Sequence, residues 1–293
     1  MNAKIQTFEA ERGHLFAVAY RMLGRASEAE DILQEAFLRF AQQDEALASA
    51  QAFLTTIVVR LCLDQLKSAR ARRESYVGPW LPEPLVSEQE PAATPEARVE
   101  LAESLSVAFL VLLERLSPLE RAAFLLREVF DRPFAEVAGV LETTEAATRQ
   151  LVARARAHID ENRPRYDAPA EKKQELLRAF ITACATQDAT ALGLVLKADV
   201  VVRSDGGGKV HAARKPILGR ERVVRFLLGI LQKEPPPGAP QLVWVNGQPG
   251  FVFRDETGTH SAVTLSIEGN EISDVWIVNN PDKLAHLTPR AAL

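Results

Sequence analysis

The chain has 293 residues, of which 47% are hydrophobic and 25% charged, and its formal net charge is −4 at pH 7. This composition is that of an ordinary soluble globular protein with room for two or three domains, and it argues against a generic nucleic-acid coat. No apolar run reaches the roughly 18 residues of a membrane helix, and the N-terminus lacks the apolar core of a signal peptide. Cys62 and Cys184 fall in apolar helical patterns, so we expect both to be buried and reduced in a cytoplasmic protein.

Charge is unevenly distributed along the chain. Residues 28–35 hold four acids and no base, whereas residues 60–73 hold five bases and one acid. Residues 149–156 hold three arginines and no acid. One acidic face and two basic faces predict several different partners.

Helices are predicted for residues 5–73. Apolar residues recur at helical spacing from Phe8 to Leu23 and again from Phe53 to Leu66. Ser27, with Glu30 three residues later, has the pattern of a capping box that opens the helix "AEDILQEAFLRF". The sequence therefore predicts an all-α domain over residues 1–74.

The composition changes at Ser75. The stretch "SYVGPWLPEPLVSEQEPAATPEA" holds five prolines and four glutamates, a content that disfavours regular structure. We therefore expect residues 75–95 to be a linker.

A second all-α domain is predicted over residues 96–165. Ser117 to Glu120 form a capping box with proline at the first helical position. The helix "FAEVAGVL", a short turn at Glu142 and the helix "TEAATRQLVARARAHID" have the pattern of a helix-turn-helix, whose second helix enters the major groove of DNA. Two packed helices with solvated arginines are the simpler alternative.

Residues 169–293 predict a third, α+β domain. Residues 169–196 and 215–233 have helical patterns. Four short runs bounded by Gly, Asn and Asp then predict antiparallel strands: "QLVWVNG", "GFVFRD", "HSAVTLSIEG" and "EISDVWIVNN".

In this order the first two domains resemble bacterial sigma factors of the extracytoplasmic-function (ECF) class. "AYRMLGRASEAEDILQEAFLRF" is similar to their regions 2.1 and 2.2, and "AQQDEALASAQAFLTTIVVRLCLDQLKSARARRE" to regions 2.3 and 2.4. "LSPLERAAFLLREVFDRPFAEVAGVLETTEAATRQLVARARAHI" is similar to region 4, although Glu142 stands where relatives often have glycine. The resemblance implies a region 2 helical bundle, a region 4 helix-turn-helix, and binding to core RNA polymerase (the beta-prime clamp helices and beta flap) and to promoter DNA.

The resemblance also implies three sets of binding residues. Those for core polymerase are Asp31, Ile32, Gln34, Glu35 and Phe37. Those for the −10 element, where single-stranded bases are held by a loop and a basic helix, are Asp44, Ser49, Arg60, Asp64, Lys67 and Arg70. Those for the −35 element are Thr144, Glu145, Thr148, Arg149, Gln150, Arg154 and Arg156.

The C-terminal domain resembles a SnoaL-like domain of the NTF2-like α+β cone fold. "WLPEPL" in the linker, "DGGGK" at 205–209 and "NPDKL" at 280–284 together resemble the ECF41, or SigJ-like, subgroup of these sigma factors. The glycine stretch is not a P-loop, because the spacing is wrong and Val210 follows the lysine. Three interpretations remain: a cone with a catalytic base among Asp205, His211 and Asp274, a rim turn that lets another backbone approach, or a plain tight turn without a regulatory role.

We favour the rim turn, with regulatory contacts between the three motifs. The predicted contact residues are Trp80, Leu81, Pro82, Asp205, Gly206, Gly207, Gly208, Lys209, Asn280, Pro281, Asp282, Lys283 and Leu284. The sequence thus predicts a sigma factor regulated in cis, without catalytic residues, metal, cofactor or a separate anti-sigma factor. The alternative is a DNA-binding regulator whose NTF2-like domain binds or turns over a small molecule.

Overall fold

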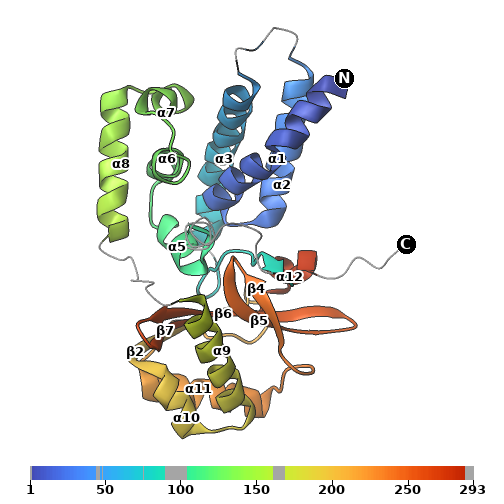
Figure 1. The fold of residues 1–293 in the computed structure, drawn as a ribbon, viewed down its shortest axis with the longest axis vertical. Helices are drawn as coiled ribbons and strands as arrows, with labels where there is room; N and C mark the ends of the chain where they lie inside the picture. The colour runs from blue at the N-terminus through green and yellow to red at the C-terminus, as the bar shows by residue number, and fades with distance from the viewer. Residues whose placement is uncertain are drawn as a thin grey trace. The chain divides into compact units, whose positions relative to one another are not determined.

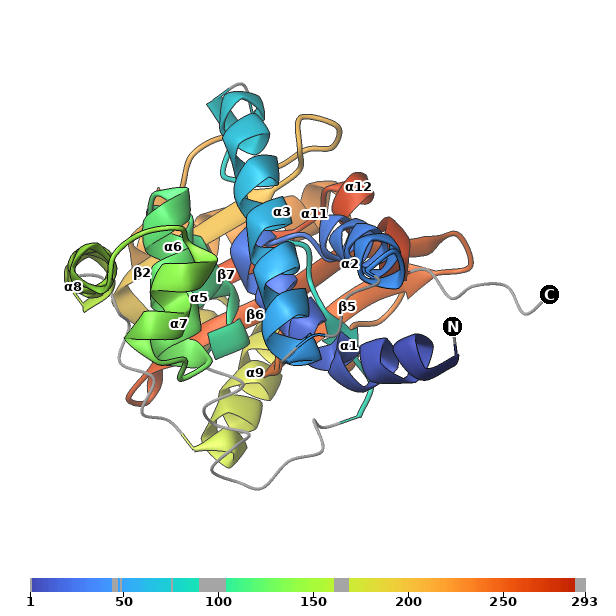
Figure 2. The same cartoon turned by 90° about the horizontal axis from the view of Figure 1, so that it is seen from above.

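The computed structural model describes residues 2–43, 47, 49–74, 76–89, 104–160 and 169–287. It divides into two compact units (Figures 1 and 2). The first contains Met1–Ser75 and Leu110–Arg163, and the second contains Tyr76–Phe109 and Pro164–Leu293. None of the described helices is long and apolar enough to cross a membrane.

The first unit is all-α. Three long helices, α1 (Asn2–Leu23), α2 (Ala26–Ala41) and α3 (Ala50–Glu74), pack against one another. Shorter helices follow: α5 (Val107–Leu113), which belongs to this unit from Leu110 on, α6 (Pro118–Phe124), a π-helical turn (Leu125–Val129), α7 (Phe134–Val140) and α8 (Glu145–Asp160). Their shared core includes Leu15, Leu54, Leu113 and Leu125, all fully buried.

Helix starts in this unit test two sequence predictions. The capping box at Ser117 is confirmed: its Oγ accepts from the Glu120 amide at 3.4 Å, and Glu120 accepts from the Ser117 amide at 3.1 Å. The box predicted at Ser27 is wrong, because α2 begins at Ala26 without any side-chain cap and Glu30 pairs with Arg12 of α1 instead.

The second unit is α+β, as predicted (Figure 1). Its seven-stranded sheet has the order β1-β4-β5-β6-β7-β2-β3. The strands are β1 (Val86–Ser87), β2 (Leu196–Asp205), β3 (Ile217–Leu218), β4 (Gln241–Val245), β5 (Gln248–Asp255), β6 (Gly258–Glu268) and β7 (Glu271–Val278). The antiparallel meander β4 to β7 is confirmed, and β2 joins β7 in parallel.

Three helices cover one face of this sheet: α9 (Ala170–Ala185), α10 (Ala189–Val195) and α11 (Arg220–Lys233). Apolar side chains of these helices and of the sheet form one core, which includes Phe180, Leu227 and Phe251. A short helix, α12 (Pro281–Leu284), follows β7. This is the order of elements expected of an NTF2-like cone.

Two expectations need correction here. The linker is not free of regular structure, because Val86 and Ser87 form β1 by pairing with Val245 and Trp244 of β4. Cys184 is only half-buried, whereas Cys62 is buried as expected, and both thiols are free. Burial raises the pKa of Cys184 to about 12.

Candidate nucleic-acid interface and the linker site

The acidic face predicted for polymerase binding lies on α2. Asp31, Gln34 and Glu35 are exposed, and Glu35 pairs with Arg39 one turn later at 2.8 Å. Phe37 is half-buried against the Phe8 ring at 5.1 Å. Ile32 is instead buried in the bundle, because it lies on the apolar face of the amphipathic α2, so it supports this surface from beneath.

The residues predicted to bind the −10 element belong to the start and the outer face of α3. Ser49 accepts from the Ala52 amide at 3.2 Å and so caps the helix. Asp64 and Lys67 form an exposed pair at 2.8 Å, and this bond lowers the pKa of the Asp64 carboxyl. Arg70 lies on α3 but its side chain is outside the described residues, as is Asp44 altogether.

Arg60 connects the two predicted DNA-binding regions. Its guanidinium donates to the Val140 carbonyl at 3.4 Å and pairs with Glu142 at 3.0 Å. Both partners lie at the helix-turn-helix turn, where Glu142 adopts a φ of 52° in the position that relatives often give to glycine. A predicted −10 residue is thus bound to the turn that positions the predicted −35 helix.

The predicted −35 residues lie along α8. Thr144 caps this helix by accepting from the Ala147 amide at 3.2 Å. Glu145, Arg149, Gln150, Arg154 and Arg156 are exposed. Thr148 is fully buried and donates to the Thr144 carbonyl at 3.0 Å, so its placement supports the helix rather than presenting the hydroxyl to DNA.

Each arginine of α8 has a partner within the first unit. Arg149 pairs with Glu145 at 3.1 Å and lies over the Phe134 ring at 4.2 Å. Arg154 pairs with Glu120 at 2.8 Å, and Arg156 pairs with Glu128 at 2.7 Å. These side chains are more than half exposed, so the pairs are weak and can exchange for phosphate.

Sequence reasoning missed Arg121, which joins the two helical regions as Arg60 does. Arg121, on α6, is 2% exposed and donates to the Met22 carbonyl of α1 at 2.6 Å. It also pairs with Glu114 at 2.6 Å, and burial lowers its pKa to about 9. The signal was an arginine placed within the otherwise apolar run "ERAAFLL", but an arginine there is equally consistent with a solvated helix face.

The second unit contains a buried contact between the linker, the glycine turn and α12. Its centre is Asp205, which is fully buried at the end of β2. The carboxylate accepts from Tyr76 Oη at 2.5 Å, from the Leu81 amide at 2.8 Å and from the Gly207 amide at 3.0 Å. These three donors hold the carboxylate in place between the linker and the glycine turn.

Lys283 of α12 completes this contact. It is 2% exposed, and its Nζ donates to Asp205 Oδ2 at 2.7 Å and to the Leu81 carbonyl. The same ammonium lies 4.2 Å from the centre of the Trp80 ring and 5.0 Å from that of Tyr76, which are cation–π distances. We call the group the linker lock, formed by the residues Tyr76, Trp80, Leu81, Asp205, Asn280 and Lys283.

The three glycines permit this close approach. A Cβ on Gly207, whose φ is 60°, would lie 2.2 Å from Asn280 Nδ2. A Cβ on Gly208 would lie 3.1 Å from Val77, and one on Gly206 would lie 2.6 Å from the Val210 carbonyl. Glycine is therefore needed both for the turn and for the space that the linker and Asn280 occupy.

The remaining predicted contact residues surround the lock. Asn280 donates to Tyr76 Oη at 2.8 Å and caps α12, which begins at Pro281. Pro82 and Leu284 are buried, and Lys209 forms an exposed pair with Asp282 at 2.7 Å. The structure therefore brings all three motifs together.

Asn246 extends the same contact, and the sequence analysis did not select it. The residue is buried, and it accepts from the Leu85 amide at 3.1 Å and donates to the Leu105 carbonyl at 3.0 Å. Its own amide donates to the Leu85 carbonyl at 2.8 Å. Its "NG" dipeptide indicated only a hairpin turn.

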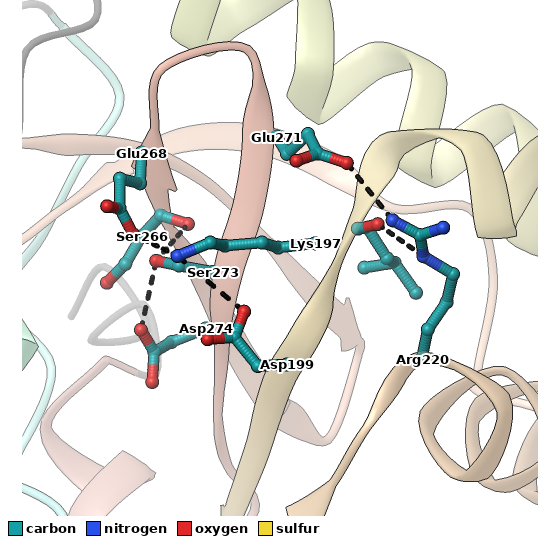
Figure 3. Close-up of polar contacts among 9 residues, drawn as sticks. Lys197, Asp199, Arg220, Ser266, Glu268, Glu271, Ser273 and Asp274 are labelled. Atoms are coloured by element: carbon teal, nitrogen blue, oxygen red, sulfur yellow. Dashed lines mark hydrogen bonds and ion pairs between the residues drawn. The ribbon is translucent and has the colours of Figure 1, made fainter.

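The acidic candidates for catalysis are committed to structural contacts. Asp205 belongs to the linker lock. Asp274 on β7 pairs with Arg203 at 2.5 Å and accepts from Ser273 Oγ at 3.0 Å. Figure 3 shows Asp274 beside further ion pairs, formed by Lys197 with Glu268 and by Arg220 with Glu271. Among the described residues, no group of three His, Cys, Asp or Glu side chains could hold a metal ion.

Known proteins resemble this chain over most of its length. Residues 7–72 match the family Sigma-70 region 2, and residues 106–159 match Sigma-70, region 4. The chain is 40% identical over 290 residues to the ECF RNA polymerase sigma factor SigJ of Mycobacterium tuberculosis, covering 96% of this chain and 93% of the relative. It is 32% identical over 289 residues to a probable ECF RNA polymerase sigma factor, SigI, of the same species, covering 94% and 93%.

A solved structure matches as well. The crystal structure of the extracytoplasmic-function sigma factor SigJ of M. tuberculosis aligns with a TM-score of 0.79 at 38% identity. The alignment covers 98% of this chain and 100% of the other. The similarity therefore extends through the C-terminal α+β unit and is not confined to the two helical regions.

Proposed function

The chain belongs to the ECF family of RNA polymerase sigma factors, which act in transcription initiation, and we propose that its linker lock regulates that activity in cis. The observation that carries the proposal is the buried Asp205–Lys283 pair, which holds the linker through the Leu81 backbone and the Trp80 ring. That linker joins region 2 to region 4. The lock therefore acts on the segment that sets how far apart the two DNA-reading regions can be.

The finer assignment of partners follows from the exposed faces. We propose that the acids of α2 bind the beta-prime clamp helices of core polymerase and that region 4 also meets the beta flap. The basic face of α3 and its preceding loop would hold the −10 element, and α8 would read the −35 element. Because a sigma factor needs polymerase and DNA, we place its action in the cytoplasm.

The contact of Arg60 with the helix-turn-helix indicates whether the linker lock lowers or raises transcription. Arg60 is bound to Glu142 and to the Val140 carbonyl, so the −10 and −35 surfaces share a contact that DNA would have to replace. Tyr76 to Ser87 are held in the second unit by the lock and by β1. Release of these residues would lengthen the tether between the two regions. We therefore propose that the locked state limits transcription and that release raises it.

The test is run-off transcription with core RNA polymerase and the promoter upstream of the chain's own gene. Trp80→Ala removes the ring over Lys283, and Gly207→Ala places a Cβ against Asn280. Each variant should raise transcription relative to wild type. Because both open one contact, the double variant should resemble the stronger single variant and should not show the product of the two effects.

Leu194→Ala is the control, since Leu194 is 77% exposed on α10 and lies outside the linker lock. Its transcription should equal that of wild type. Strictly multiplicative effects of the two lock variants, or wild-type activity in both, would show that the lock does not regulate. Failure of wild-type protein to support initiation at any promoter would contradict the sigma-factor role itself.

The proposal assigns to the C-terminal unit the role that a separate anti-sigma protein has in other systems. The alternative, a regulator whose C-terminal unit catalyses a reaction, has less support. Asp205 and Asp274 are both bound to cations, and His211 is paired with Glu234 at 2.6 Å. The two acidic candidates are therefore already held in ion pairs.

A further inference from the structure

Phe134, the first residue of α7, lies against an arginine that is predicted to bind the −35 element. The half-buried ring has its centre 4.2 Å from the guanidinium carbon of Arg149. Helices α7 and α8 are the two helices of the helix-turn-helix, so a residue of the first helix contacts a predicted DNA-binding residue of the second. Sequence patterns assigned no role to Phe134.

A second arginine contacts the same ring and is itself held in place. The guanidinium carbon of Arg127 lies 5.1 Å from the centre of the Phe134 ring. Arg127 donates to the Asp131 carboxylate at 3.0 Å and to the Arg132 carbonyl at 3.2 Å. The side chain of Arg127 is 31% exposed, whereas that of Arg149 is 58% exposed. The ring therefore joins an anchored arginine to one that faces the solvent.

The contact with the ring leaves the base-binding atoms of Arg149 available. Arginine stacks on aromatic rings with the face of its guanidinium, and the N–H donors lie in the plane of that group. A guanidinium carbon 4.2 Å over a ring centre is within cation–π distance. One donor, on Nη2, is bound to Glu145 at 3.1 Å, in an exposed pair that can exchange. The in-plane fork that matches guanine O6 and N7 can therefore still bind a base.

We propose that Phe134 is a positioning residue for −35 recognition, whose ring orders the Arg149 side chain and so sets how strongly this arginine discriminates between bases. A long arginine side chain loses rotamer freedom when it binds DNA, and ordering it beforehand lowers that cost. Phe134 acts through Arg149 and needs no contact with DNA. This role rests on the proposed reading of the −35 element by α8.

The test measures promoter binding by holoenzyme assembled from core RNA polymerase and the full-length chain. The DNA is the promoter upstream of the chain's own gene, with each −35 position substituted in turn by the other three bases. Discrimination is the dissociation constant for a substituted base divided by that for the preferred base. The position at which Arg149→Ala lowers this ratio identifies the base that Arg149 contacts.

Phe134→Leu keeps an apolar side chain but removes the ring. At the position identified by Arg149→Ala, it should lower the discrimination ratio about two- to fivefold, the range expected for loss of one exposed cation–π contact. Binding to a wrong base does not use the ordered fork, so only the preferred base is affected. Ratios at the other −35 positions should equal those of wild type. A purely structural role would instead weaken binding to all sequences evenly.

Three further variants serve as controls. Phe134→Tyr keeps the ring and should keep the wild-type ratio. Phe16→Leu makes the same exchange at a half-buried ring of α1, which stacks on Tyr20, and should leave every −35 ratio unchanged. In the double variant with Arg149→Ala, Phe134→Leu should cause no further loss, because the arginine through which it acts is absent.

The role of Phe134 would be wrong if Phe134→Leu kept the wild-type ratio, lowered the ratios at all −35 positions equally, or lowered the ratio further in the Arg149→Ala background. Each ratio is measured within one variant, so a smaller folded fraction does not change it, and Phe134→Met replaces Phe134→Leu if the leucine variant does not fold. An effect of Arg149→Ala without one of Phe134→Leu would remove the role of Phe134 alone. No effect of Arg149→Ala at any position would remove both the base contact and the role of Phe134.

Discussion

The arginines of α8 and the lysine of the linker lock use the same chemistry under opposite conditions of exposure. Arg149, Arg154 and Arg156 pair with carboxylates while their side chains stay 57–58% exposed. Lys283 and Asp205 pair at 3% and 0% exposure. An exposed ion pair contributes less than about 1 kcal/mol to the free energy of unfolding and is screened by salt. Removing one partner of a buried pair leaves the other charge buried without compensation.

This difference matches the two proposed roles. A surface that must release its carboxylates to take DNA phosphates needs weak, exchangeable pairs. The linker lock must hold the linker, so it needs contacts that break together and are not replaced one at a time by solvent or ions.

The largest effect is expected for Lys283→Met. It leaves Asp205 buried without its cation, which should lower the free energy of unfolding of the second unit by about 3–5 kcal/mol. Lys209→Met is the matched control, because Lys209 pairs with Asp282 at the same 2.7 Å but both side chains are 54% exposed. It should cost less than about 1 kcal/mol.

Urea unfolding followed by tryptophan fluorescence makes this measurement, because all three tryptophans, Trp80, Trp244 and Trp276, belong to the second unit. Equal losses in the two lysine variants would contradict the contrast between buried and exposed pairs.

Gly207→Ala should have the next largest effect. Gly207 and Gly269 share a φ of 60°, but a Cβ on Gly269 meets nothing within 4 Å, whereas one on Gly207 meets Asn280. Gly269→Ala should therefore cost about 1 kcal/mol from backbone strain alone. Gly207→Ala should cost about 2–3 kcal/mol, since Asn280 must also move. Equal urea midpoints for Gly207→Ala and Gly269→Ala would mean that Asn280 moves aside without cost. Gly207 would then be needed only for its positive φ.

The fold was largely predictable from sequence because its signals are local. Helical periodicity, the Ser117 capping box and the four-strand meander each depend on neighbouring residues. The failures arise where a distant partner decides the local outcome. Glu30 pairs with Arg12 of another helix and so does not complete a capping box. Val86 is part of a strand only because it pairs with the edge of β4.

The site was predictable in part, for the same reason. The motifs "WLPEPL", "DGGGK" and "NPDKL" were selected as contact segments, and the structure brings them together at Asp205. Tyr76 and Asn246 were missed, because a tyrosine in a linker and an "NG" turn carry no sequence signal of their long-range hydrogen bonds. Ile32 and Thr148 were assigned to surfaces although their side chains are buried. A motif identifies a stretch of sequence but does not tell which of its residues face the solvent.

Arg149→Ala tests the exposed pairs of α8. If Arg149 contacts a base, its loss should cost about 1–3 kcal/mol at one −35 position and relax preference there. The stability of the first unit should be nearly unchanged, because the Glu145 pair is exposed. Arg154→Ala is the control for a phosphate contact, and it should weaken binding evenly across sequences. Holoenzyme binding to promoters substituted at each −35 position distinguishes the two, and an unchanged base preference in Arg149→Ala would exclude the base contact.

The smallest effect concerns His14, a half-buried imidazole that, unlike Lys283, forms no ion pair among the described residues. His14 packs edge-on against Phe130 at 5.1 Å, and its buried Nε2 has no hydrogen-bond partner among the described residues. Burial lowers the pKa of His14, and the positive charges of Arg132 and Arg21 act in the same direction against the opposing Glu11.

The sign of the pH dependence follows from that lowered pKa. The folded chain favours neutral imidazole, so below the ordinary pKa of about 6.5 the unfolded chain binds more protons than the folded chain. The stabilisation is therefore complete above that pH and is lost as pH falls through the lower pKa of the folded state. His14→Phe keeps an aromatic ring beside Phe130 but cannot titrate, so its thermal midpoint, measured by circular dichroism from pH 8 to pH 5, should fall less than that of wild type. If the thermal midpoint of His14→Phe follows the wild-type curve at every pH, the acid sensitivity of the first unit arises from other groups. The prediction for His14 would then be wrong.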